Sequence, residues 1–247
     1  MPLLILSIAV QVALIVHVIR TGRNTLWIWA IALLPLAGSV AYIVAEVIPG
    51  LRSSRSARGA VRAVRNTLDP DRDLRQYANE VRLSGNVDSR RKLAEEQANK
   101  GQLQEAIATY RGAMTGIYQH DPTLMLGLAN AQFANRDYRD CRETLDALIQ
   151  HNPDFKSPDG HLLYARALEG EGNADKAFEE YRALSKYYPG AEARVRFAQM
   201  LKQRGDVSQA AAILRELLDT AELAPRHYRK AQREWLDLAR RELIRPE

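Results

Sequence analysis

Histidine and cysteine are the residues of this 247-residue chain that could bind a metal ion or act as nucleophiles. Cys141 is the only cysteine, and none of His120, His151, His161 and His227 belongs to an HExxH, CxxC or comparable pattern. No phosphate-binding P-loop motif occurs either. His120 and His151 are expected at the C-termini of helices, where a partial positive charge is favourable. The sequence therefore predicts a protein that is not an enzyme and that has no metal and no cofactor.

A pattern that recurs four times must position the remaining side chains. Its expected turn residues are spaced 35, 36 and 33 residues apart: Gly101, Arg136, Gly172 and Gly205. Small residues stand seven positions before and five positions after each turn: Ala94, Ala129, Ala165 and Ala198, then Ala106, Cys141, Ala177 and Ala210. Large apolar residues follow nine positions after each turn, and leucine follows twelve positions after three of the four turns. This spacing predicts pairs of amphipathic helices that bury their apolar sides only by stacking on one another.

The four copies resemble the tetratricopeptide repeat over residues 87–222. The resemblance implies an all-α protein whose main part is an α-solenoid of about four helix pairs. Cys141 occupies one of the small-residue positions, so a buried thiol is expected there and not a nucleophile. The first copy departs from the family pattern by about one extra turn before Pro122.

Two apolar stretches precede the repeats. The first, Leu3 to Ile19, is interrupted by few polar residues, among them Gln11 and His17, and the second runs from Leu26 to Ile48. At about 1.5 Å per residue the two stretches are roughly 26 and 35 Å long, against about 30 Å of hydrocarbon in a bilayer. We expect a two-helix transmembrane hairpin in residues 1–50, with hydrogen bonds from Gln11 and His17 across it. One span with a buried or interfacial segment is the alternative, and a cleaved signal peptide is a weaker one.

The second stretch also resembles a known anchor. It carries a tryptophan pair at its start and small or cyclic residues inside it: Trp27, Trp29, Leu34, Pro35, Gly38 and Tyr42. These residues resemble the N-terminal membrane hairpin that precedes the catalytic domains of phospholipase D-type cardiolipin synthases. The catalytic His-x-Lys-x4-Asp motif of that family is absent from the chain. The resemblance therefore implies a shared anchor and no shared chemistry.

Positive charge is concentrated just after the second stretch. The chain has a net charge of +5, and the linker at residues 51–69 holds five arginines: Arg52, Arg55, Arg58, Arg62 and Arg65. Beyond them basic and acidic residues nearly balance, so binding to nucleic acid is not expected. Because positive flanks stay in the cytoplasm, the repeats are expected on the cytoplasmic side of an inner or plasma membrane, although Arg20 and Arg23 oppose this orientation. The five arginines could contact anionic lipid headgroups. Alternatively, they could stay exposed to solvent and serve only to set the orientation of the protein in the membrane.

Helices are also expected on both sides of the repeats. Residues 70–86 predict an N-terminal capping helix with a stripe of Leu74, Tyr77, Ala78 and Val81. Residues 223–247 predict one C-terminal capping helix that starts at Pro225 and uses Trp235 as an anchor in the fourth repeat. Such capping helices give the ends of a stack a polar face that is exposed to solvent.

In the family, the first helices of each pair line a concave face that binds partners. The corresponding positions form the candidate peptide groove: Arg91, Leu126, Asn130, Phe133, Leu162, Arg166, Gln199 and Lys202. Arg91, Asn130 and Arg166 could clamp a terminal carboxylate, although Glu95 and Glu169 would oppose it. A less specific peptide groove is favoured, and self-association stays open.

These features together predict a membrane-anchored, non-enzymatic adaptor that binds protein or peptide partners and contacts membrane lipid. Two other functions remain possible. The chain could be an accessory subunit of a lipid-modifying or envelope-assembly complex, in which the hairpin itself contacts lipid or enzyme. It could also be a periplasmic assembly factor with the opposite topology. The sequence does not identify the partner.

Overall fold

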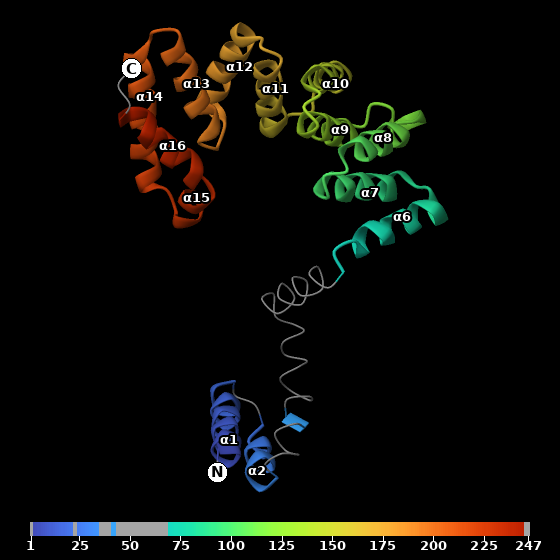
Figure 1. Cartoon of the computed structure of the whole chain (residues 1–247), viewed down its shortest axis with the longest axis vertical. Coiled ribbons are helices and arrows are strands. Elements are labelled where there is room, and N and C mark those ends of the chain that lie inside the picture. Colours follow the sequence, from blue (N-terminus) through green and yellow to red (C-terminus); the bar gives the residue numbers. More distant parts are fainter. Residues whose placement is uncertain (1, 22–23, 35–40, 43–68, 245–247) are drawn as a thin grey trace. The chain divides into compact units, whose positions relative to one another are not determined.

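The computed structural model describes residues 2–21, 24–34, 41–42 and 69–244. Every regular element within these ranges is a helix, in agreement with the predicted all-α class (Figure 1). The chain divides into two compact units, Met1–Arg72 and Asp73–Glu247.

Among the described residues of the first unit, α1 (Pro2–Thr21) and α2 (Leu26–Leu33) contact each other. The side-chain amide of Gln11 donates a hydrogen bond of 3.1 Å to the backbone oxygen of Ile31. This bond joins α1 to α2, as the sequence predicted for Gln11.

His17 makes the second predicted bond, because its Nδ1 lies 2.9 Å from the hydroxyl of Tyr42. Tyr42 is buried together with Val18 and Ile31, and the ring of Trp27 meets it edge-on at 5.4 Å between centroids. The first unit thus has a small apolar cluster of its own.

The expected membrane spans are only partly covered by the described residues. Helix α2 contains the first eight residues of the second apolar stretch, and most of the rest of that stretch lies outside the described ranges. Within those ranges no helix is both long and apolar enough to cross a bilayer. The five linker arginines, Arg52, Arg55, Arg58, Arg62 and Arg65, also lie outside them. The transmembrane hairpin and its lipid contacts therefore stay predictions.

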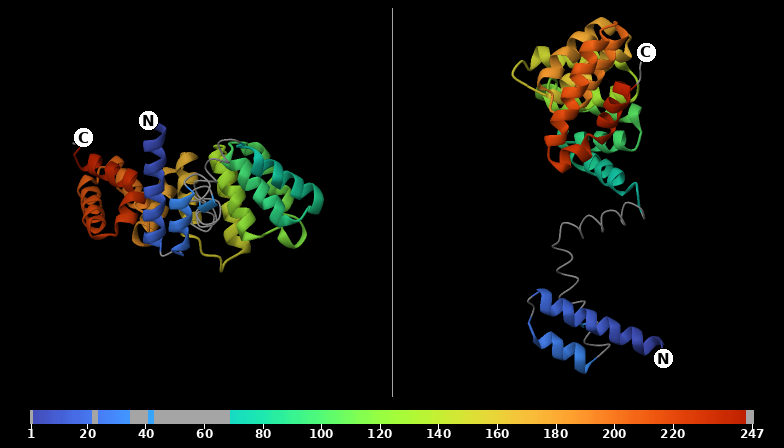
Figure 2. Two further views of the ribbon diagram at one scale, coloured as in Figure 1. Left: turned by 90° about the horizontal axis from the view of Figure 1, so that it is seen from below. Right: turned by 90° about the vertical axis from the view of Figure 1, so that its left-hand side faces the viewer.

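In the second unit, successive helices pair and follow one another along an arc (Figures 1 and 2). A lead-in helix, α6 (Arg72–Ser84), is followed by four pairs: α7 (Val87–Asn99) and α8 (Leu103–Ala113), α9 (Pro122–Ala134) and α10 (Tyr138–His151), α11 (Pro158–Gly170) and α12 (Ala174–Tyr187), α13 (Glu192–Gln203) and α14 (Val207–Leu223). Two more helices complete the unit, α15 (Arg226–Ala231) and α16 (Arg233–Ile244).

The four predicted turn residues all adopt the left-handed conformation. Their φ angles are 76° for Gly101, 67° for Arg136, 81° for Gly172 and 84° for Gly205. After each of them the next residue donates a 2.9 Å hydrogen bond to the carbonyl five positions earlier, which closes the first helix of the pair. The turn positions were therefore predicted correctly. Arg136 is the one residue other than glycine with a positive φ in the described ranges.

The recurring small residues are the points of closest contact between helices. All eight are 0% exposed: Ala94, Ala106, Ala129, Cys141, Ala165, Ala177, Ala198 and Ala210. Because Cys141 is a free, fully buried cysteine, the predicted buried thiol is confirmed, and this burial raises its pKa to about 12.

The structure corrects three details of the prediction. Helix α8 ends at Ala113 and a short 3-10 helix, Gly116–Tyr118, replaces the expected extra turn. His120 therefore follows this 3-10 helix, whereas His151 does end α10. The C-terminal helix is interrupted at Gln232, whose side-chain oxygen accepts a hydrogen bond from the backbone of Ala191.

The predicted lead-in helix is present as α6, and its role as a cap stays a prediction. No residue of α6 is buried, and α6 contributes to none of the hydrophobic clusters of the described chain. Its stripe of Leu74, Tyr77, Ala78 and Val81 stays only half-buried. The stripe is short and has an alanine in its centre, so it offers little apolar area to the first repeat.

Candidate functional site

The inner face of the stack is formed by the first helices of the pairs. Helix α7 contacts α9, and α9 contacts α11, so side chains from successive repeats come together there. Asp121 and Ser157 cap the N-termini of α9 and α11 with side-chain hydrogen bonds to backbone N–H groups, and a proline follows each cap. These caps fix where the helices start and therefore which side chains reach the inner face.

Phe133 and Arg166 form the centre of the candidate groove. The guanidinium of Arg166 lies over the Phe133 ring, 4.7 Å from its centroid. The Nε of Arg166 lies 3.5 Å from a carboxylate oxygen of Glu192 and has no hydrogen-bond partner among the described residues. Close by in the sequence, Asn130 is exposed, and its amide donates a 2.8 Å bond to the backbone oxygen of Leu126 in its own helix. The structure thus joins an aromatic ring, a cation and a polar amide near the junction of repeats two and three.

A network of ion pairs continues from this centre into the fourth repeat. Arg196 donates to Glu192 at 2.8 Å and to Glu169 at 2.9 Å, and Glu169 also accepts a 2.8 Å bond from the Tyr181 hydroxyl. Burial raises the pKa of Tyr181, so this hydroxyl remains a donor. The guanidinium of Arg196 also lies 5.1 Å from the ring centroid of Trp235.

The sequence reasoning did not single out Arg196 or Glu192. Their spacing of four residues on one helix was an available signal, because residues at that spacing are neighbours on the helix surface. The contacts with Glu169 and Trp235 could not be read in this way, since they come from other helices.

The paired charges limit what the groove can hold. Arg166 and Arg196 are matched by Glu169 and Glu192. Arg91 is bound by Asp88 at 2.8 Å and by Glu95 of its own helix. Both arginines of the expected carboxylate clamp therefore already have carboxylate partners, which disfavours the clamp.

The fourth-repeat end of the candidate groove is covered by α16. The ammonium of Lys202 donates to the backbone oxygen of Glu242 at 2.5 Å and lies 3.3 Å from its carboxylate. Gln199 donates to the same carboxylate at 3.2 Å. Lys202 thus satisfies a carbonyl at the C-terminus of α16, where a cation is favourable.

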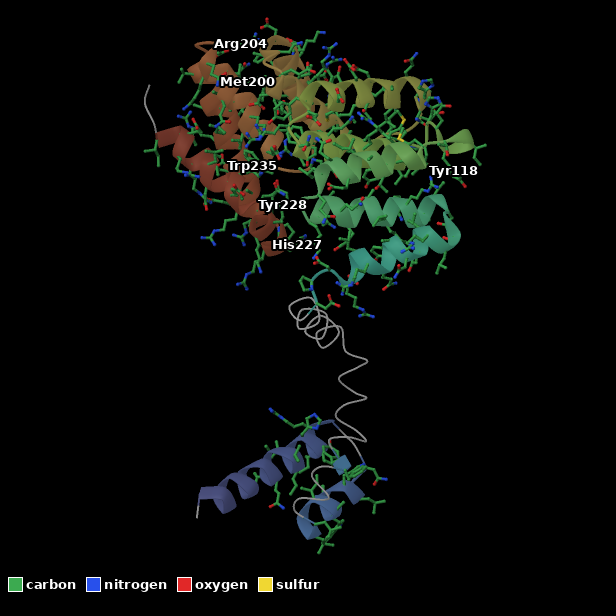
Figure 3. The ribbon with its side chains drawn as sticks, turned by 45° about the vertical axis from the view of Figure 1, so that its right-hand side comes forward. Tyr118, Met200, Arg204, His227, Tyr228 and Trp235 are labelled. Carbon is green, nitrogen blue, oxygen red and sulfur yellow. The ribbon has the colours of Figure 1, made fainter. Side chains whose placement is uncertain are left out.

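Two further side chains complete this end. Trp235 packs against the hydrophobic cluster of the last two repeats, as expected of an anchor, and Figure 3 labels it with Tyr228 on the C-terminal helices. Leu162, which was expected in the groove, is only 5% exposed and belongs to the same cluster. The accessible part of the inner face therefore lies in repeats one to three.

Two histidines outside the groove lie against each other. His120 and His151 are stacked on each other with 3.6 Å between ring centroids. Within the part of the chain that the structure describes, no three histidine, cysteine, aspartate or glutamate side chains are arranged to hold a metal ion.

Comparisons with known proteins agree with this architecture. Two sequence models of the tetratricopeptide repeat match residues 97–167 and 159–191. The solved structure of MamA shares 20% identity with a TM-score of 0.55, and covers 64% of this chain and 92% of its own. MamA from Desulfovibrio magneticus RS-1 shares 15% identity with a TM-score of 0.55, and covers 66% and 91%.

A third structure, YrrB, shares 15% identity with a TM-score of 0.50 and covers 67% of this chain and 91% of its own. At such identities the likeness concerns the fold. No curated protein sequence matches the chain. Residues 97–191 carry tetratricopeptide repeats, the building unit of non-enzymatic protein-interaction scaffolds.

Proposed function

We propose that the chain is a membrane-anchored adaptor. Its repeat stack binds a polypeptide partner on the accessible inner face, and its apolar N-terminal unit holds the stack at an inner or plasma membrane. The repeats lie on the cytoplasmic side. The protein acts by bringing a partner to the membrane and not by catalysis.

The observation that carries the groove is the group formed by Asn130, Phe133 and Arg166. Asn130 is exposed, and a side-chain amide on an inner helix can pair with the backbone of an extended peptide. Phe133 stands three residues further along the same helix, and with Arg166 it offers an aromatic surface and a partly exposed guanidinium. Because the neighbouring charges are matched, a segment of mixed or neutral charge fits this face better than a free carboxylate terminus. YrrB, of the same fold, is described as a TPR protein with an unusual peptide-binding site, which supports this type of function.

A pull-down from detergent-solubilised membranes tests the groove. Asn130→Ala and Arg166→Glu should each reduce the recovery of partners, whereas Arg139→Glu should not. Arg139 is the matched control, because it is an 80% exposed arginine on the second helix of repeat two. Circular dichroism and the melting temperature report whether each variant is folded. If Asn130→Ala, in which no ion pair is lost, recovers the same partners in the same amounts, the groove is not the binding surface.

The membrane anchor is supported by the sequence of residues 1–50 and by the polar bonds between the two apolar segments. Gln11 and His17 pair with the backbone of Ile31 and with the hydroxyl of Tyr42. Such bonds hold helices together in lipid, where unpaired polar groups are costly. A reporter fused after Glu247 tests the anchor and its orientation. A signal from a cytoplasm-specific reporter is expected, and a signal from a periplasm-specific one would instead support the opposite topology.

A further inference from the structure

A second candidate site shares no lining residue with the candidate groove. A pocket of about 520 Å³ is enclosed by α10, the connection 152–157, α11 and α12. Its walls include Leu148, Ile149, Phe155, Tyr164 and Tyr187. This volume falls within the range of about 300 to 1,000 Å³ that is typical of ligand pockets. We name it the Phe155 pocket.

Exposed apolar side chains gather around the Phe155 pocket. Ile149 is 61% exposed, Tyr187 is 52% exposed and Phe155 is 38% exposed. The three residues come from α10, from the connection and from α12, and they line one pocket. Single exposed apolar residues are ordinary, but a contiguous group of them marks an interaction site.

The polar side chains of the pocket indicate which part of a ligand could enter. His161 uses both ring nitrogens, because its Nε2 lies 2.5 Å from a carboxylate oxygen of Glu180 and its Nδ1 is bonded to the Tyr187 hydroxyl. Glu180, the one carboxylate among the lining residues, is therefore already bound. A group inserted between these walls has little to hydrogen-bond with, so an apolar group fits best.

The charge at the edge of the pocket comes from Lys156. Its ammonium donates a 3.0 Å bond to the backbone oxygen of Pro153, which is a neutral acceptor. Lys156 is exposed and can turn towards an incoming anion, because its present bond is to a carbonyl and not to a carboxylate.

We propose that the Phe155 pocket binds a bulky apolar side chain of a partner polypeptide, next to an acidic residue that pairs with Lys156. An aromatic side chain would contact Phe155 and Tyr187, and the neighbouring carboxylate would reach the ammonium group. A fatty acid combines the same two chemical groups. The polypeptide is favoured because the pocket lies within a stack of tetratricopeptide repeats, and YrrB, of the same fold, is described as a TPR protein with an unusual peptide-binding site. This site is separate from the groove of Asn130, Phe133 and Arg166, so the two can be tested independently.

Fluorescence anisotropy with the full chain tests the proposal. The probe is a fluorescein-labelled Gly-Asp-Phe-Asp-Gly peptide, with a matched peptide that has serine in place of phenylalanine. We expect the first peptide to bind and the serine peptide to bind about tenfold more weakly, since a buried aromatic anchor contributes much of such binding. Phe155→Ser and Ile149→Ser should each weaken the first peptide about tenfold. Lys156→Glu should weaken it about fivefold, and Lys176→Glu on an exposed part of α12 should leave it unchanged.

Both serine variants alter residues that are more than a third exposed, and circular dichroism confirms that each variant is folded. Equal binding of the two peptides, or equal binding by the wild type and Phe155→Ser, would overturn the proposal. So would saturable binding of oleate at the pocket without any binding of the peptide. Loss of binding in the pocket variants but not in Asn130→Ala would support a site distinct from the groove.

Discussion

Arg136 provides a direct test of how the repeat turns are stabilised. It has a φ of 67°, at a position where the other three repeats have glycine at 76°, 81° and 84°. A residue with a Cβ atom loses about 1 to 2 kcal/mol in the left-handed region. Glycine avoids this cost but loses more conformational entropy on folding, roughly 0.5 to 1 kcal/mol. Arg136→Gly should therefore raise the free energy of unfolding by about 0.5 to 1 kcal/mol.

The reverse change isolates the same effect. A Cβ atom built on Gly172 has no heavy atom within 4 Å, so Gly172→Ala changes the backbone energy without a steric clash. It should lower the free energy of unfolding by about 1 kcal/mol. Arg136→Ala is the matched control at the turn that lacks glycine, because it removes the charge of the side chain and keeps a Cβ atom at the strained φ. Its free energy of unfolding should stay within about 0.5 kcal/mol of the wild type.

Urea unfolding followed by far-ultraviolet circular dichroism measures these differences. Because neighbouring repeats contribute separately to the stability of a stack, hydrogen exchange in α9 and α10 shows whether the gain is local to the second repeat. If Arg136→Gly and Arg136→Ala stabilise the protein equally, the effect arises from the arginine side chain. The explanation through backbone strain would then be refuted.

Three further changes test the packing. A Cβ atom on Gly127 would lie 2.6 Å from the buried ring of Tyr110, so Gly127→Ala should lower the free energy of unfolding by about 1 to 3 kcal/mol. Urea unfolding measures this change, and Gly172→Ala is the comparison, because a Cβ atom there has no heavy atom within 4 Å. Burial raises the pKa of the Cys141 thiol to about 12, so a disulfide reagent at pH 8 should label it much more slowly in the native protein than in urea, and equal rates would contradict its burial. Burial also raises the pKa of Tyr110 to about 12, above the ordinary tyrosine pKa of about 10. Between these two values the unfolded chain binds fewer protons than the folded one, so the free energy of unfolding should fall as the pH rises from about 10 to 12, and less steeply in Tyr110→Phe.

The features that repeat in the sequence were the ones that could be predicted. Each turn and each small-residue position occurs four times at a spacing of 33 to 36 residues, so each copy can be checked against the other three. The four turns have a positive φ and the eight small residues are 0% exposed for the same reason, namely that two helices must approach closely beside a tight reversal. The bonds of Gln11 and His17 could also be predicted. The break between the two apolar segments is short, so the segments lie side by side and polar side chains of the first can reach the second.

The details that could not be predicted depend on contacts between elements that the repeat pattern does not describe. The pairing of Arg196 with Glu169 joins α13 to α11, and the pairing of Lys202 with Glu242 joins α13 to α16. Neither follows from spacing along one helix. The connection 152–157 forms a wall of the Phe155 pocket, but Phe155 does not recur in the other repeats, where the matching positions are His120, Ala191 and Ala224.

In the proposed function, the position of α16 limits the part of the inner face that a partner can reach. Leu236 and Ala239 are 3% and 0% exposed within the hydrophobic cluster of the last two repeats, so α16 is an integral part of the stack. Because Glu242 of this helix binds Gln199 and Lys202, these two positions are satisfied by the chain itself. The group around Phe133 and Arg166 lies in the middle of what remains. A partner that binds there meets matched charges on the side of the fourth repeat, so its selection must rest on shape and on contact with the aromatic ring more than on net charge.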